Sequence, residues 1–153
     1  MARPNNSKSM NNKILIGSIE NFALPELGIS SLEVRIDTGA QTSSLHVDNI
    51  ELCEDASTNW VRFDIHPNVH DVDEVLECSA QLKAERNIKS SNGTSEKRYV
   101  IETIVQLAGQ SWPIELSLTD RSDMNYLMLF GREGMADRVL IDPSSTFLLK
   151  SGD

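Results

Sequence analysis

The sequence contains few features of a membrane, secreted or disulfide-stabilised protein. Its 153 residues include only two cysteines, Cys53 and Cys78, and no CxxC spacing joins them. The fold must therefore depend on a hydrophobic core, with both thiols free. No apolar run approaches the roughly 20 residues of a transmembrane helix, and the first residues lack the apolar segment of a secretory signal. We expect a cytoplasmic protein with no membrane partner.

Positive charge is also scarce, because 14 lysines and arginines stand against 23 acidic residues, for a net charge of −9. This balance argues against nucleic acid as the main partner, since phosphate binding requires a basic surface. The charge is uneven, however: residues 48–77 are strongly acidic, and residues 83–98 are basic. An anionic substrate could bind at the basic segment, although two solvated loops would explain the same pattern.

Signals for a bound metal or nucleotide are missing as well. No glycine-rich loop with a lysine is present, so nothing supports ATP binding. The three histidines are His46, His66 and His70. His66 and His70 are four residues apart, but Pro67 and polar neighbours argue against a helix that would present both to a metal. We predict no metal and no cofactor.

The sequence does contain a succession of short alternating segments. Residues 32–37 and 61–65 alternate apolar and polar side chains, as half-buried strands do. Residues 99–107 and 112–118 alternate in the same way around a turn at Ala108-Gly109, which predicts a β-hairpin. This pattern predicts an all-β sandwich or barrel. We expect a disordered polar lead-in at residues 1–12 and one domain at residues 13–150.

The region 66–98 is long and polar, and such loops in compact domains are usually functional. Within it Asn92-Gly93 favours a type I′ turn, because both central positions of that turn need positive φ. We therefore expect an arm that projects from the barrel and bends at these two residues.

Asp37-Thr38-Gly39-Ala40 follows an alternating strand and resembles the active-site signature of aspartic peptidases. In these enzymes a carboxylate activates water as half of a pair that shares one proton, because two like charges in contact cannot both ionise. Gly39 would let the backbone approach closely, and Thr38 offers a hydroxyl that could bond to a matching loop. The same residue types also close ordinary strands, so the short match leaves both interpretations open.

A late segment supports the peptidase interpretation. Leu129-Phe130-Gly131-Arg132 resembles the apolar-apolar-Gly-Arg segment that leads into the short helix of retroviral-type peptidases. We accordingly expect one short helix in "REGMADR", directly after Gly131. An ordinary strand end would also explain Gly131, and a surface charge would explain Arg132.

These stretches together resemble a whole family, the bacterial retropepsin-like proteins catalogued as ATP-dependent zinc proteases. The matching segments are "ALPELGI", "VRIDTGAQTSSLH", "WVRFDIHP", "SSNGTSEKRYVIET", "WPIELSLTDRSDM", "MLFGRE" and "VLIDPSSTFLL". The resemblance implies a closed retropepsin-like barrel, a catalytic role for Asp37 with Thr38 and Gly39, and structural roles for Gly131 and Arg132. It also implies a link to ATP-grasp ligases that add glutamate tails, and to peptidases that act on such tails.

The sequence departs from the retroviral pattern at Gln41, where an acidic residue usually pairs with the late arginine. Arg132 therefore needs another partner or has a different role. Because the chain holds a single Asp-Thr-Gly, a carboxylate pair requires a homodimer in which Asp37 from each subunit meets on a two-fold axis.

We therefore predict an aspartic-type peptidase that cuts peptide bonds, with glutamate-rich tails as the substrate that the resemblance suggests. A non-catalytic binding module of the same fold, which holds an acidic peptide without cutting it, remains the alternative. The candidate substrate-binding residues are Arg35, Ala40, Ser91, Asn92, Gly93 and Arg98.

Overall fold

The structure is a computed structural model that describes residues 12–54, 59–66, 74–89, 93–120 and 126–149. Its strands are β1 (Ile14–Ile16), β2 (Ile19–Leu24), β3 (Ile29–Ile36), β4 (Ser43–His46), β5 (Asp48–Glu54), β6 (Asn59–Ile65), β7 (Leu76–Lys89), β8 (Ser95–Leu107), β9 (Gln110–Thr119), β10 (Met128–Phe130) and β11 (Val139–Ile141). A 3₁₀ turn, η1 (Pro25–Leu27), and a short α-helix, α2 (Arg132–Met135), accompany them. The predicted all-β fold with a short helix after Gly131 is confirmed.

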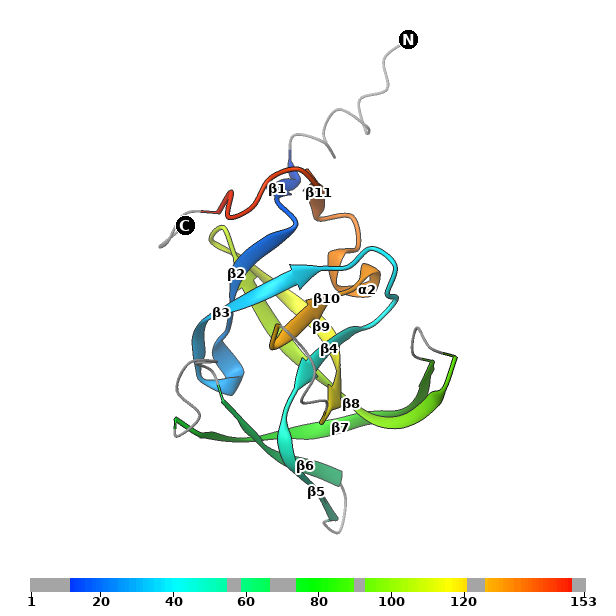
Figure 1. Cartoon of the computed structure of the whole chain (residues 1–153). Helices are drawn as coiled ribbons and strands as arrows, with labels where there is room; N and C mark the ends of the chain where they lie inside the picture. Colours follow the sequence, from blue (N-terminus) through cyan, green and yellow to red (C-terminus); the bar gives the residue numbers. More distant parts are fainter. Residues whose placement is uncertain (1–11, 55–58, 67–73, 90–92, 121–125, 150–153) are drawn as a thin grey trace.

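Six strands form a closed ring. Neighbouring strands pair in the order β2-β3-β10-β4-β9-β8, and a bridge between Ala23 of β2 and Gln106 of β8 closes the circle. Strands β7, β6 and β5 continue from β8 and extend away from the ring (Figure 1). Because closure pairs the outer strands of the ring with each other, it removes exposed edges there.

The core fills the ring as the alternation predicts. Leu32 and Val34 of β3 are buried, whereas Glu33 and Arg35 between them are exposed. The hairpin of β8 and β9 is also confirmed, and its turn places Ala108 at φ 52° and Gly109 at φ 73°. Among the described residues no helix has the length and apolar character needed to cross a membrane.

Much of the predicted polar loop at 66–98 is strand instead. β7 pairs with β8 as far as Lys89 and Ser95, and the end of this hairpin projects from the molecule (Figure 1). β7 alternates half-buried with exposed residues, and the half-buried side of its outer part carries Ala80, Leu82, Ala84 and Ile88, interrupted by Arg86. This period of two is weak because two of the apolar residues are alanines and charged residues are frequent, so the segment was interpreted as a polar loop. Gly93 has φ +89°, as the predicted bend requires, while Ser91 and Asn92 lie outside the described residues.

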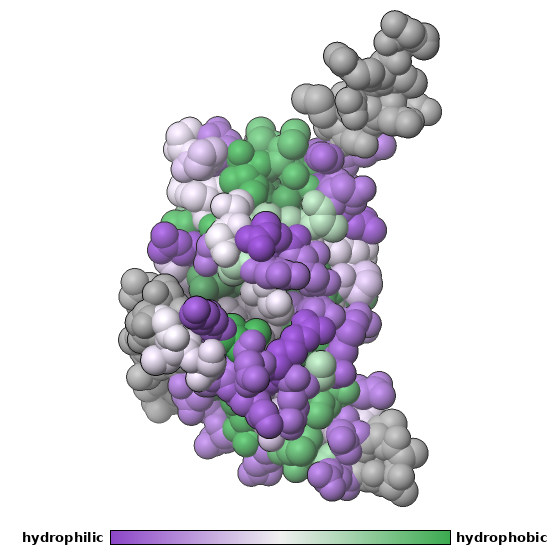
Figure 2. All heavy atoms as spheres, turned by 90° about the vertical axis from the view of Figure 1, so that its right-hand side faces the viewer, coloured by the Kyte–Doolittle hydropathy of each residue, from purple (hydrophilic) through white to green (hydrophobic). Residues whose placement is uncertain are grey.

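A second, two-stranded sheet joins the two ends of the described chain, with β1 parallel to β11. Glu20 is fully buried beside it and accepts hydrogen bonds from the backbone N–H groups of Gly17 (2.7 Å), Leu148 (2.8 Å) and Leu149 (3.1 Å). These bonds fix the C-terminal segment against the start of the chain. Apolar surface gathers at this end of the molecule (Figure 2).

Both cysteines are free, as predicted, but they lie in different surroundings. Cys78 is buried, and its thiol donates to the carbonyl of Leu27 at 3.4 Å. Burial, together with the negative charge of Asp64, raises the pKa of the Cys78 thiol to about 11. Cys53 is exposed on β5, so only Cys78 contributes to the core.

Candidate active site

Asp37 lies where two segments distant in sequence meet. β3 pairs in parallel with β10, so that Ile36 stands opposite Phe130. The backbone N–H of Asp37, the next residue, donates to the carbonyl of Phe130 at 2.9 Å. The aspartate is half-buried at this strand end, beside the start of the Gly131-Arg132 segment.

The loop after β3 folds back on the aspartate. The backbone N–H of Gly39 donates to Oδ1 of Asp37 at 3.0 Å, and that of Ala40 donates to the Asp37 carbonyl at 3.2 Å. A Cβ at Gly39 would stand 3.3 Å from the same Oδ1, closer than most real contacts. Glycine at this position therefore lets a backbone donor hold the carboxylate in place.

The Gly131 segment is joined to the aspartate loop by backbone bonds. The N–H groups of Arg132 and Glu133 donate to the carbonyls of Ala40 (2.9 Å) and Gln41 (2.8 Å). The N–H of Gly131 donates to the buried Ser43 hydroxyl at 2.9 Å. A Cβ at Gly131 would lie 2.8 Å from the carbonyl carbon of Thr42, so the two segments can cross only at a glycine.

Arg132 has a partner other than a carboxylate. Its Nη1 donates to the carbonyl of Thr38 at 2.8 Å, within the Asp37 loop. The predicted need for a partner other than residue 41 is thus met by a charge-assisted bond to the backbone. Gln41 itself is exposed.

Further contacts connect α2 to the hairpin arm. The indole N–H of Trp112 donates to the carbonyl of Gly134 at 2.8 Å, and Oε1 of Glu133 accepts from the backbone N–H of Glu115 at 3.0 Å. The guanidinium of Arg86, on β7, binds both carboxylate oxygens of Glu115 at 2.6 and 3.2 Å. The bond from Arg86 is the main reason that the pKa of Glu115 lies below its usual range.

The predicted substrate-binding residues fall into different environments. Arg35 is exposed on β3 close to Asp37, Ala40 is half-buried in the Asp37 loop, and Gly93 is exposed at the arm. Arg98 is buried, with 7% of its surface exposed, and its guanidinium donates to Glu96 at 3.1 and 3.2 Å. The charge of Arg98 is therefore compensated within the arm.

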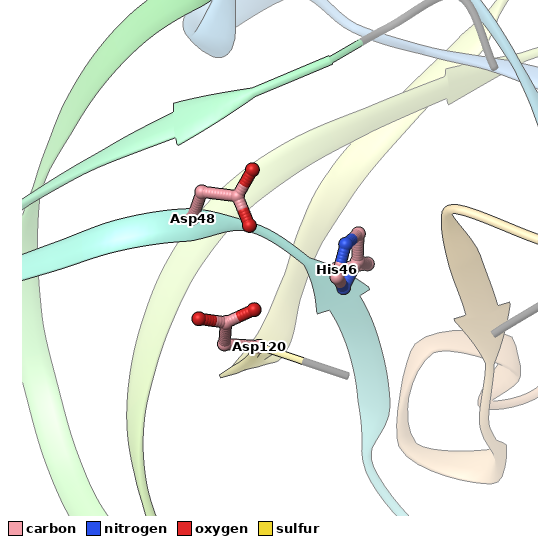
Figure 3. Close-up of side chains that lie close together, drawn as sticks. All are labelled: His46, Asp48 and Asp120. Carbon is pink, nitrogen blue, oxygen red and sulfur yellow. The ribbon is translucent and has the colours of Figure 1, made fainter. Parts of the chain in front are cut away.

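Sequence reasoning missed a group of side chains at the other end of β4. His46, Asp48 and Asp120 place one ligand atom each within 4.8 Å of the others (Figure 3). No spacing could have revealed this group, because Asp120 comes from the end of β9, far along the chain.

The ring and the Asp37 loop, crossed by a glycine-arginine segment, define a retropepsin-like aspartic peptidase fold. The family model described as "Retropepsin-like aspartic endopeptidase RimB" matches residues 15–151. The chain belongs to this RimB-like family. Lpg0085 of Legionella pneumophila, a crystal structure described as of unknown function, is similar with a TM-score of 0.75 and 26% identity; the match covers 90% of this chain and 98% of that one.

Two similar curated proteins are each named "Probable alpha-L-glutamate ligase". The protein of Shewanella pealeana is 47% identical over 93% of this chain, and that of Parasynechococcus marenigrum is 41% identical over 92%. The matched regions make up 31% and 30% of those relatives. The chain thus spans less than a third of the length of the curated relatives it matches.

Proposed function

We propose that the chain is an aspartic peptidase whose catalytic dyad forms when Asp37 from two copies meet. The observation that carries this proposal is the Asp37 carboxylate, presented at a strand end and held by the Gly39 N–H in a retropepsin-like fold. One Asp37 takes a proton from water as general base. The other, protonated, polarises the scissile carbonyl, because two adjacent carboxylates share one proton.

Dimerisation is supported by an apolar surface on the segments at the two ends of the described chain. The terminal patch consists of Leu15, Leu140, Phe147 and Leu148, which are 52%, 37%, 45% and 38% exposed. Leu15 and Leu140 stand side by side in the β1–β11 pairing. Exposed apolar residues that cluster in this way are typical of association surfaces.

The patch is tied to the residue just before the aspartate. The carbonyl of Ser18, two residues after β1, accepts from the N–H of Ile36 at 2.9 Å, and the N–H of Ser18 donates to Ser145 at 2.7 Å. The dimer that we propose joins two copies through the terminal patch, which these bonds connect to the strand that ends just before Asp37.

A glutamate-rich substrate is supported by the relatives and by charge. The relatives named as probable glutamate ligases contain a region similar to nearly this whole chain. A domain that removes glutamates would act on the product of one that adds them. In this chain, Arg35 lies exposed near Asp37, and Lys89 and Lys97 are exposed on the arm, where they could bind an acidic tail.

The test is cleavage of an oligoglutamate-tailed peptide by the wild type and by Asp37→Asn, with a chelator present and without ATP. We expect the wild type alone to shorten the tail. Asp137→Asn, which changes an exposed carboxyl beyond α2, is the matched control and should cleave like the wild type. If neither wild type nor Asp37→Asn cuts but both bind the peptide, the chain is a binding module and the peptidase proposal fails.

A further inference from the structure

The group at the end of β4 follows from the strand arrangement. β4 and β9 are parallel, and His46 stands opposite Thr119. Parallel strands end at the same edge, so His46, the last residue of β4, comes close to Asp120, which directly follows β9. The N–H of Val47 donates to the Thr119 carbonyl at 2.9 Å, and the chain then turns to place Asp48 at the start of β5.

The corner that carries Asp48 is fixed by its own contacts. Asn49 adopts a φ of 54°, a conformation that asparagine tolerates better than most residues. Its side-chain amide donates to Oδ2 of Asp64 on β6 at 2.8 Å. Nε2 of His66, just after β6, lies 2.7 Å from Oδ2 of Asp48. This contact orients the Asp48 carboxylate.

Two carboxylates and an imidazole at this separation suit a cation. Carboxylate oxygens of Asp48 and Asp120 that lie within 4.8 Å of each other repel unless a positive charge intervenes. In a tetrahedral zinc site, ligand atoms at the usual bond lengths stand about 3.4 Å apart. Side-chain rotations that move the ligand atoms by about an ångström would therefore bring the three atoms to bonding positions. His46 and Asp48 are half-buried and Asp120 is exposed, and the three side chains lie near one another at the ends of β4 and β9 (Figure 3).

We propose that His46, Asp48 and Asp120 bind one divalent cation of the zinc class, and that His66 is a positioning residue that holds Asp48. An imidazole with two carboxylates favours zinc, because calcium and magnesium prefer sites made only of oxygen atoms. A hydrogen bond from histidine to a ligating carboxylate is a common outer contact in such sites. The histidine spacing in the sequence gave no sign of this group, because the third residue, Asp120, follows β9 and comes close to His46 only in the fold.

This site is separate from the proposed peptidase site. β4 begins at Ser43, whose hydroxyl holds Gly131, and ends at His46. Three residues of strand span about 10 Å, so a cation at His46 lies beyond direct contact with the Asp37 loop. The cation would link the β4–β5 corner to the end of β9, and so stabilise this edge of the ring.

The experiment measures zinc binding by untagged, full-length protein after removal of metal by a chelator. We expect one zinc per chain by elemental analysis, and no competition from a large excess of magnesium. His46→Gln and Asp120→Asn should each raise the Kd for zinc at least tenfold, and His66→Gln about tenfold through its effect on Asp48. Replacing zinc with Co²⁺ should give the visible absorption of a tetrahedral centre, and this absorption should be lost in His46→Gln.

The controls separate this proposal from the peptidase proposal. Asp37→Asn and Asp137→Asn should bind zinc like the wild type, whatever their effect on cleavage. Asp120 is exposed, so Asp120→Asn should retain the fold by circular dichroism. The proposal is overturned if the wild type takes up no stoichiometric zinc. It is equally overturned if zinc binds but folded His46→Gln and Asp120→Asn bind it as tightly as the wild type.

Discussion

At the Ser43 end of β4, backbone groups hold the Asp37 loop, whereas at the His46 end side chains from separate strands approach one another. The first end depends on glycines that allow segments to cross, and on N–H and carbonyl groups that bond across the crossing. The second end depends on where parallel strands stop and on which side chains follow them. A site held by backbone bonds at a close crossing requires glycine at fixed positions in the sequence. A site formed by side chains at strand ends requires no such local pattern.

The largest effects should come from an experiment that changes one residue at each site and measures both cleavage and zinc binding in each variant. Asp37→Asn should reduce cleavage of the acidic peptide at least about 10³-fold, because the amide cannot act as the base of a dyad, and should leave the Kd for zinc unchanged. His46→Gln should weaken zinc binding and keep cleavage within about threefold of the wild type, measured with chelator present. Loss of both functions in either variant would show that the two ends of β4 are not independent.

The contrast also explains what the sequence could predict. Asp37, Gly39 and Gly131 lie in short motifs whose glycines are required by contacts as close as 2.8 Å, so the candidate active site was visible as a pattern. Alternation revealed β3, β8 and β9 because one face of each strand is buried.

The features that were missed depend on contacts between remote segments. The outer part of β7 has only a weak hydrophobic period, because alanines supply half of its apolar residues and Arg86 interrupts them, and the strand is held by pairing with β8. The bond from Arg132 to the Thr38 carbonyl uses a backbone acceptor, which no residue type signals. The proximity of Asp120 to His46 follows only from the parallel pairing of β4 with β9.

A second large effect should follow from a charge in the terminal patch. Leu140→Glu places a carboxylate beside Leu15, and a buried unpaired charge opposes association strongly. We expect a monomer by analytical ultracentrifugation, with cleavage reduced at least about tenfold at low protein concentration and zinc binding retained. Val75→Glu, which alters an exposed apolar residue outside the patch, is the control and should leave the dimer intact. A monomeric Leu140→Glu that cleaves at the wild-type rate would contradict a dyad shared between subunits.

An intermediate effect should distinguish a crowded glycine from an open one. Gly131→Ala would push a methyl group to 2.8 Å from the Thr42 backbone, so we expect a loss of about 2–3 kcal/mol in the free energy of unfolding. Gly93→Ala meets nothing within 4 Å, but its φ of +89° is unfavourable for alanine, and the loss should be about 1 kcal/mol. Urea denaturation of both variants measures these differences. Equal losses would mean that the crossing at Gly131 is less tight than the structure shows.

The smallest effect concerns the contact that joins the arm to the Ser43 end. Arg86 is 38% exposed and Glu115 only 14%, so Arg86→Gln should cost about 0.5–1 kcal/mol near pH 7, after allowance for screening by solvent. The pKa of Glu115 is lowered, chiefly by the bond from Arg86, so its contribution is complete above the ordinary carboxyl range and is lost as the pH falls through the lowered value. The stability difference between wild type and Arg86→Gln should therefore be constant from about pH 7 to 5 and shrink below about pH 4.

Arg62→Gln provides the matched control for this measurement, because Arg62 pairs with Glu77 in a contact where both side chains are more than half exposed, at 51% and 61%. Water screens such a pair, so the substitution should change stability by less than about 0.5 kcal/mol at any pH. A difference for Arg86→Gln that grows on acidification would have the wrong sign for a carboxylate stabilised by arginine. In that case the Glu115 carboxylate would not be the charged link between Arg86 of the arm and the segment that contacts α2.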